Sequence, residues 1–242
     1  MQSLNWYRRR LLAMSPGEII WRLKSKLRDQ MDRRRAGHFQ ATFDLNRVYK
    51  GPIEEPALCS AVVGGRQLPV PGLLGESVGY DKSWKDKLLS RADKILDNRI
   101  TLFDLEDHDL GARIDWNYEY KAGQKTPLKF AADIDYRDYA ESGDCKFAWE
   151  LSRFQHAVAL GRAYRLTADR RYAEAVVRHF LSWIEQCPYP HGMQWRSPLE
   201  LGIRLINWVW ALEMVRPSGL LTPAFWRNIL PVVYFHLFEI TR

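Results

Sequence analysis

Apolar residues recur at helical spacing along most of the chain, most regularly from position 144 onward. The helices predicted there cover about residues 146–166, 170–186, 198–215 and 223–242. Short polar connections separate them, which favours antiparallel helical hairpins. The last predicted helix contains Pro231 and has no stop signal before Arg242. We therefore expect a mainly α protein whose final helices lack a covering partner.

Two sequences have the pattern of a helix start. Ser15 and Ser197 are each followed by Pro at the first helical position and by Glu three residues after the Ser. The first start opens a helix with apolar residues at helical spacing and a basic opposite face. That basic face is either solvated or in contact with an anionic membrane or polymer, and solvation is the commoner case.

The segment between the N-terminal helices and the hairpins is irregular. Residues 37–80 are rich in Gly and Pro and are expected to be extended, whereas 84–97 is predicted to be helical and 100–103 to be a strand. A long irregular segment such as 104–143 often covers a cleft. The predicted organisation is thus basic N-terminal helices over 1–36, an irregular segment over 37–143 and stacked helices over 144–242.

Charge narrows the range of partners. The net charge is +7, and ten Lys and Arg residues lie within 1–35, so the sequence favours an acidic partner: nucleic acid, anionic lipid or acidic polysaccharide. The three cysteines are widely spaced and show no metal-ligand pattern, so we expect no metal and no cofactor. No apolar run reaches the length of a membrane span, and no signal peptide is evident, so a cytoplasmic location is expected.

Two similar groups of residues lie near the starts of predicted helices. Each contains a Trp, a Glu and an Arg: Trp149, Glu150 and Arg153 in the first, Trp195, Glu200 and Arg204 in the second. Each Glu and Arg are close on the helix surface and could simply form an ion pair. If alternate helices run the same way, however, both groups line one rim. That rim would suit an acidic sugar, because Arg binds carboxylates and sulfates at two points.

The sequence gives less specific evidence for residues that could act as an acid or a base than for the two Trp–Glu–Arg groups. His191 lies in the loop before Trp195, and Tyr136 is one of several tyrosines in the irregular segment. Either could transfer a proton, but histidines and tyrosines in such positions are more often non-catalytic. The sequence contains no phosphate-binding Gly loop, nucleophile elbow or HExxH metal motif.

Five short motifs follow one another through the helical part. They are W-E-L-x-R at 149–153, A-Y-x-L-T at 163–167, R-Y-A at 171–173, S-W-I-E-Q at 182–186 and W-x-S-x-x-E-x-x-x-R at 195–204. Their order and spacing resemble the N-terminal helical domain of the heparinase II/III family. The segment from Trp6 to Arg28 resembles family members from bacterial polysaccharide gene clusters.

The resemblance implies a polysaccharide lyase with an incomplete (α/α) toroid followed by an antiparallel β-sandwich. Its reaction would be β-elimination at a uronic acid. The substrate-binding residues that it implies are Trp149, Glu150, Arg153, Gln194, Trp195, Glu200 and Arg204. Gln194 departs from the family, where many members have Asn. The β-sandwich has no counterpart here, so the chain is expected to be a C-terminally truncated fragment whose catalytic set lies beyond Arg242.

Three functions are therefore in view. The first is the substrate-binding part of a polysaccharide lyase that acts on an acidic polysaccharide and pairs with the missing β-sandwich domain. The second is a non-catalytic protein that binds anionic polysaccharide during capsule or exopolysaccharide production. The third is a basic binder of nucleic acid or of a membrane surface. We favour the first and expect no nucleic-acid partner; exported family members make a periplasmic location the alternative.

Overall fold

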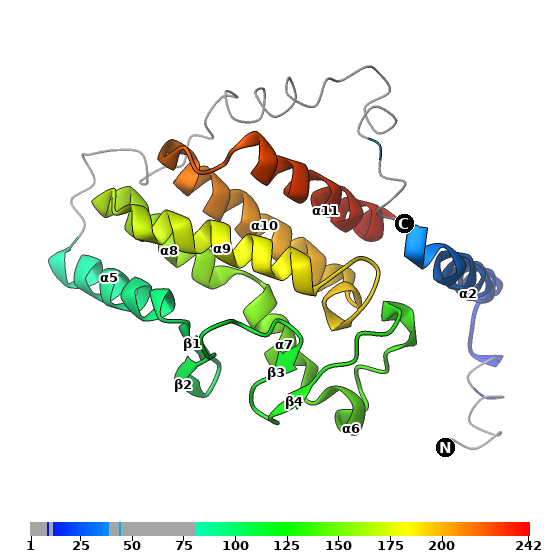
Figure 1. The fold of residues 1–242 in the computed structure, drawn as a ribbon. Helices are drawn as coiled ribbons and strands as arrows, with labels where there is room; N and C mark the ends of the chain where they lie inside the picture. The colour runs from blue at the N-terminus through cyan, green and yellow to red at the C-terminus, as the bar shows by residue number, and fades with distance from the viewer. Residues whose placement is uncertain (1–8, 10–11, 39–43, 45–80) are drawn as a thin grey trace. The chain divides into compact units, whose positions relative to one another are not determined.

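The computed structural model describes residues 9, 12–38, 44 and 81–242, and these are mainly helical (Figure 1). The chain forms two compact units, Met1–Thr42 and Phe43–Arg242. Most of the helix predicted before Ser15 and the extended segment predicted over 37–80 fall outside the described residues. The three-part division predicted from the sequence stays a prediction.

The first unit contains helix α2 (Pro16–Arg35), followed by the 3-10 turn η1 (Ala36–His38). The helix begins as predicted, because the Ser15 hydroxyl accepts a hydrogen bond from the backbone N–H of Glu18 at 3.2 Å. One turn later, Arg22 donates to the Glu18 carboxylate at 2.8 Å. Capping and an i,i+4 ion pair thus stabilise the first turns of α2.

In the described part of the second unit, the first helix is α5 (Lys82–Leu96), which was predicted over 84–97, and small antiparallel hairpins follow it. The strands are β1 (Arg99–Leu102) with β2 (Leu105–Asp109), and β3 (Tyr118–Glu119) with β4 (Gln124–Lys125). The turn η2 (Ala131–Asp133) and the short helix α6 (Tyr139–Ser142) follow. The predicted strand at 100–103 is confirmed within a residue, whereas β2 was missed because its polar sequence has no β-branched residue.

The single helix predicted over 146–166 is wrong. The chain forms α7 (Cys145–Ser152) and α8 (Gln155–Thr167), with a break at Phe154, whose φ of 64° is left-handed. That conformation costs a bulky residue about 1–2 kcal/mol. Burial offsets the cost: the Phe154 ring is 0% exposed and stacks on Trp116 at 5.2 Å between ring centroids.

The remaining predicted helices are confirmed. They are α9 (Arg170–Gln186), α10 (Pro198–Val215) and α11 (Pro223–Thr241), with 3-10 turns η3 (Met193–Trp195) and η4 (Arg216–Ser218) between them. Pro231 lies inside α11 without ending it. Helix α10 starts after Ser197 with Pro198 in its first turn, as predicted, but the Ser197 side chain makes no cap hydrogen bond, so the predicted capping box does not form.

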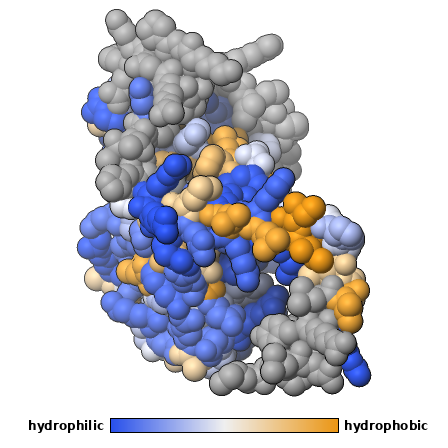
Figure 2. Space-filling view, turned by 90° about the vertical axis from the view of Figure 1, so that its right-hand side faces the viewer, coloured by the Kyte–Doolittle hydropathy of each residue, from blue (hydrophilic) through white to orange (hydrophobic). Residues whose placement is uncertain are grey.

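Helices α8 to α11 lie side by side, with α5 against α8 (Figure 1). Neighbours in sequence pack on each other, as expected of hairpins, and α8 also contacts α10 while α9 contacts α11. Buried rings fill the space between these helices, chiefly those of Trp116, Phe154, Phe180, Trp183 and Trp208. On the face drawn in Figure 2, hydrophilic residues predominate and hydrophobic ones gather in patches.

Close packing of α8 against α10 gives a test of the fold. A Cβ on Gly161 would lie 2.9 Å from Met214 Cβ, whereas a Cβ on Gly202 of α10 would meet no atom within 4 Å. We expect Gly161→Ala to lower the free energy of unfolding by roughly 1–3 kcal/mol through overpacking. Gly202→Ala should raise it by about 0.5–1 kcal/mol through helix propensity. Urea unfolding measures both, and stabilisation by Gly161→Ala would contradict the packing described.

Candidate functional site

An ion-pair network joins the two Trp–Glu–Arg groups. Arg153 donates from Nε and Nη2 to the two carboxylate oxygens of Glu200 at 2.7 and 2.8 Å. Its Nη1 donates to Glu150 at 2.5 Å. The hydrogen bonds with Glu200 raise the pKa of Arg153 above its ordinary value. The network connects the end of α7 with the start of α10, so the structure brings together residues that the sequence places 47 positions apart.

The ion pair considered for Glu200 and Arg204 is wrong. Arg204 is 0% exposed and points into the core, and in the described part of the chain its hydrogen-bond partners are neutral. Nε donates to the Ser152 carbonyl at 2.7 Å, and Nη1 donates to the Gln194 carbonyl at 3.1 Å. Nη1 also lies 3.0 Å from His236 Nε2, and the guanidinium covers the Trp183 ring at 4.6 Å.

Burial determines the protonation states of Arg204 and His236. Loss of solvation lowers the pKa of Arg204 to about 10, which still leaves it charged at neutral pH. Burial and the nearby Arg204 charge lower the pKa of His236 well below its ordinary range. His236 is therefore neutral. Its Nδ1 lies 2.7 Å from the Val232 carbonyl and donates to it, which leaves Nε2 to accept from Arg204.

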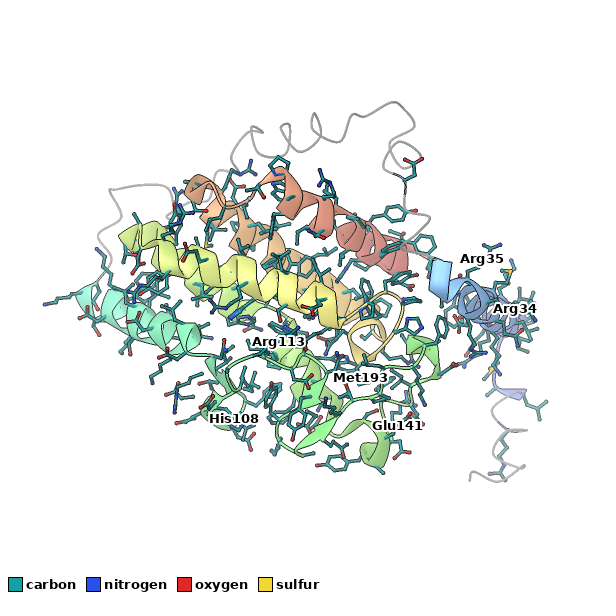
Figure 3. All side chains as sticks on the ribbon, in the orientation of Figure 1. Arg34, Arg35, His108, Arg113, Glu141 and Met193 are labelled. Carbon is teal, nitrogen blue, oxygen red and sulfur yellow. The ribbon has the colours of Figure 1, made fainter. Side chains whose placement is uncertain are left out.

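The other predicted substrate contacts from these groups are also largely buried. Trp149 and Trp195 are 8% and 5% exposed, and their indole N–H groups donate to the carbonyls of Met193 and Cys187 at 2.9 Å. Gln194 is 0% exposed and donates to the Trp116 carbonyl at 2.8 Å. These side chains hold the loop around η3, in which Met193 is labelled in Figure 3. Substrate contact by them stays a prediction.

The more open part of the site surrounds Tyr136. This half-buried ring lies 5.5 Å from the Trp149 ring. The Arg196 and Arg137 guanidinium groups lie 5.1 and 5.5 Å from its centroid. Arg196 is oriented by donating from Nε to the Ile134 carbonyl at 3.0 Å. Sequence analysis missed both arginines, although Arg137 follows Tyr136 directly and Arg196 follows Trp195.

His191 is half-buried in the loop after α9, where its backbone forms a bridge with Phe130. No hydrogen bond between the side chains of His191 and Tyr136 occurs among the described residues. Their roles as acid–base groups stay predictions. In the same described ranges, no cluster of His, Cys, Asp or Glu is placed to hold a metal ion. Nor does any helix there have the length and apolar character needed to cross a bilayer.

A separate cavity of about 230 Å³ lies between α10 and α11, lined mainly by apolar side chains. Trp208 and Trp226 contribute to its wall, and Glu213 and Arg216 are its charged lining residues. None of the predicted site residues lines it. Its apolar lining does not suit a charged sugar, so we place the candidate site at Tyr136 and the Arg153 network instead.

Removing the buried guanidinium should destabilise the fold more than removing the half-buried one. Arg204→Met leaves the Ser152 and Gln194 carbonyls and His236 Nε2 without their donor. We expect a loss of roughly 3 kcal/mol or more in the free energy of unfolding. Arg153→Met should cost less, because the side chains of Arg153 and Glu150 are 21% and 18% exposed and water can replace part of the lost contact, whereas Arg204 is fully buried. Chemical denaturation measures the free energy of unfolding of both variants. Equal decreases would show that the fold does not depend more on Arg204 than on Arg153.

Buried histidines should make stability pH-dependent. Burial, with a smaller effect of Arg91, lowers the pKa of His156 to about 3, against 6.5 ordinarily. Between these values the unfolded chain binds a proton that the folded chain does not. The contribution of His156 to the free energy of unfolding is therefore fully present above pH 6.5. Between pH 6.5 and 3 the free energy of unfolding falls by about 1.4 kcal/mol per pH unit for one histidine. Denaturation midpoints from pH 8 to 5 test this, and His156→Phe should lower the slope by the share of one histidine, because burial also lowers the pKa values of His179 and His236.

Comparisons with known proteins agree with the helical architecture. The chain is 25% identical over 139 residues to a heparin-sulfate lyase of Bacteroides stercoris, a match that covers 49% of this chain and 21% of the relative. A crystal structure of a heparan sulfate lyase mutant from Pedobacter heparinus superposes with a TM-score of 0.54 at 20% identity. A heparinase III with methylated lysines superposes with a TM-score of 0.55 at 18% identity.

These superpositions cover 76% and 84% of this chain but only 27% and 31% of the solved structures. The chain thus spans less than a third of the length of the relatives it matches. At such identities the solved structures establish the fold alone. The family model described as Heparinase II/III N-terminus matches residues 82–236, which include α5 through most of α11. The chain therefore belongs to the heparinase II/III N-terminal domain family.

Proposed function

We propose that this chain is the substrate-binding, N-terminal part of a heparinase II/III-like polysaccharide lyase that acts on an acidic, uronate-containing polysaccharide. Family membership over residues 82–236 supports the class of protein. The names of its relatives, heparin-sulfate lyase and heparan sulfate lyase, support an anionic polysaccharide as the ligand. The net charge of +7 agrees with such a partner.

The observation that carries the proposal is the half-buried Tyr136 ring with the guanidinium groups of Arg196 and Arg137 at 5.1 and 5.5 Å from its centroid. An aromatic ring offers a flat surface for a sugar. A guanidinium binds a carboxylate or sulfate through two parallel hydrogen bonds. A half-buried ring with two cations therefore matches the two chemical features of a uronate unit.

The Arg153 network has a different role in this proposal. Arg153 donates three hydrogen bonds to two carboxylates, so its charge is already balanced within the protein. It holds Glu150, whose side chain is 18% exposed, at the edge of the site. There Glu150 accepts hydrogen bonds from sugar hydroxyls. Arg204, Gln194, Trp149 and Trp195 support this surface from beneath.

The wider architecture and chemistry belong to the same proposal. Contacts between alternate helices, α8 with α10 and α9 with α11, support an incomplete (α/α) toroid as the architecture. A β-sandwich domain would complete the protein. β-Elimination requires neutralisation of the uronate carboxylate and transfer of the C5 proton. The proton-transfer groups are unassigned, with His191 and Tyr136 as weak candidates. We expect a cytoplasmic location, or a periplasmic one as for exported family members.

A non-catalytic role in binding anionic polysaccharide during capsule or exopolysaccharide production is the second candidate. It is favoured by the burial of Gln194 and Arg204, each 0% exposed and hydrogen-bonded within the core. In the described residues, the exposed groups of the site bind anions and form no matched acid–base pair. Both candidates require polysaccharide binding at Tyr136, and they differ in whether the bond is broken.

Binding can be measured by calorimetry with heparan sulfate. Arg137→Gln and Arg196→Gln should each weaken binding about tenfold, which corresponds to about 1.4 kcal/mol for a lost charged contact. The control is Arg162→Gln, an exposed arginine of α8 that removes the same charge. If all three variants weaken binding equally, affinity follows total charge and the site at Tyr136 is wrong.

Cleavage is measured separately, by the absorbance of unsaturated uronate products during incubation with acidic polysaccharides. We expect the 242-residue chain to bind without releasing these products. The reason is that the described residues supply anion-binding groups and no positioned pair for proton transfer. Robust product formation would show instead that this chain contains the active site, and Tyr136→Phe and His191→Ala would then identify the acid–base group.

A further inference from the structure

Helix α2 exposes its apolar side to solvent. Five large apolar residues along it are more than half exposed: Ile20 at 54%, Trp21 at 64%, Leu23 at 58%, Leu27 at 60% and Met31 at 52%. At about 100° of rotation per residue, all of them except Trp21 fall within one narrow stripe, which Arg34 enters near its C-terminal end. Asp32, by contrast, is only 8% exposed. The helix thus presents to solvent the residues that a core helix would bury.

The charges of α2 are arranged around this stripe. By the same rotation, cations lie along both of its edges. They are Lys24, Arg28 and Arg35 on one side and Lys26 and Arg33 on the other, whereas Arg22 lies beside Glu18 and pairs with it. The carboxylates of Glu18, Asp29 and Asp32 lie on the opposite face. Arg34 and Arg35 extend from the C-terminal end of the helix (Figure 3). The helix therefore has an apolar centre, basic edges and an acidic back.

We propose that α2 is an interfacial helix that lies flat on an anionic lipid membrane. The apolar stripe would enter the boundary between headgroups and acyl chains, while the basic edges contact lipid phosphates. Lys and Arg suit those edges because their aliphatic stems lie along apolar surface as their charges reach the headgroups. The acidic face, which is the less exposed side of α2, then points away from the anionic lipid.

The arrangement fits lipid better than nucleic acid. A phosphate backbone is bound by cations alone and gives no reason to expose five large apolar side chains. A membrane surface uses both features, the apolar stripe and the cations beside it. The proposal concerns α2 alone and does not depend on polysaccharide binding by the second unit.

The test is co-sedimentation of the full 242-residue chain with vesicles. One set contains about three parts phosphatidylcholine to one part phosphatidylglycerol, and the other contains phosphatidylcholine alone. We expect binding to the anionic vesicles and at least tenfold weaker binding to the neutral ones. The double variant Leu23→Glu/Leu27→Glu should reduce binding to anionic vesicles about a hundredfold, because it places charges in the apolar stripe.

A matched control makes the same kind of change at two exposed positions of another helix. Leu199 and Ile206 of α10 are 69% and 61% exposed, so Leu199→Glu/Ile206→Glu adds equal charge elsewhere. This control should bind vesicles within about threefold of the unaltered chain. Absence of binding to anionic vesicles by the unaltered chain would overturn the proposal. Full retention of vesicle binding by Leu23→Glu/Leu27→Glu would also overturn it. If that variant then binds single-stranded RNA equally well, the chain is a general polyanion binder.

Discussion

The fold of the second unit depends on a buried cation. The Arg204 guanidinium is removed from water without a carboxylate among its described hydrogen-bond partners, and burial lowers its pKa to about 10. Such a group is tolerated only where hydrogen bonds replace its hydration. Carbonyl groups at the end of α7 and in η3, together with a ring nitrogen of α11, supply them. Three segments far apart in the sequence are thereby fixed around one side chain of α10.

The candidate site is built outward from that core. The Ser152 carbonyl accepts from Arg204, and the next residue, Arg153, turns outward to Glu200. The residue after that, Phe154, takes the left-handed conformation that ends α7 and returns its ring to the core. Of these three consecutive residues, Ser152 and Phe154 belong to the core and Arg153, between them, belongs to the candidate site. The ion pairs of Arg153 with Glu150 and Glu200 owe their geometry to the backbone fixed at Ser152 and Phe154. Tyr136 packs on Trp149, whose indole N–H is bound to η3.

The two units of the chain use charge in different ways. In the second unit, arginines are held by specific acceptors, as the Arg153 and Arg204 contacts show. On α2 the cations line an exposed apolar stripe, and their shared property is position around the helix. A fixed guanidinium selects a planar anion, whereas a row of cations beside an apolar stripe responds to an anionic surface. A basic composition alone does not distinguish these two uses.

The sequence by itself determined the helices from 170 onward, the start of α2 at Ser15 and the family, because helical spacing, caps and motif order are local properties. It also singled out Arg153 and Glu200, although it paired Glu200 with Arg204. Only the tertiary structure decided that Glu200 pairs with Arg153, that Arg204 is buried, and that the helix predicted over 146–166 breaks at Phe154. Each of these outcomes depends on contacts between distant segments, where the burial of one ring or one guanidinium outweighs the local preference of the backbone.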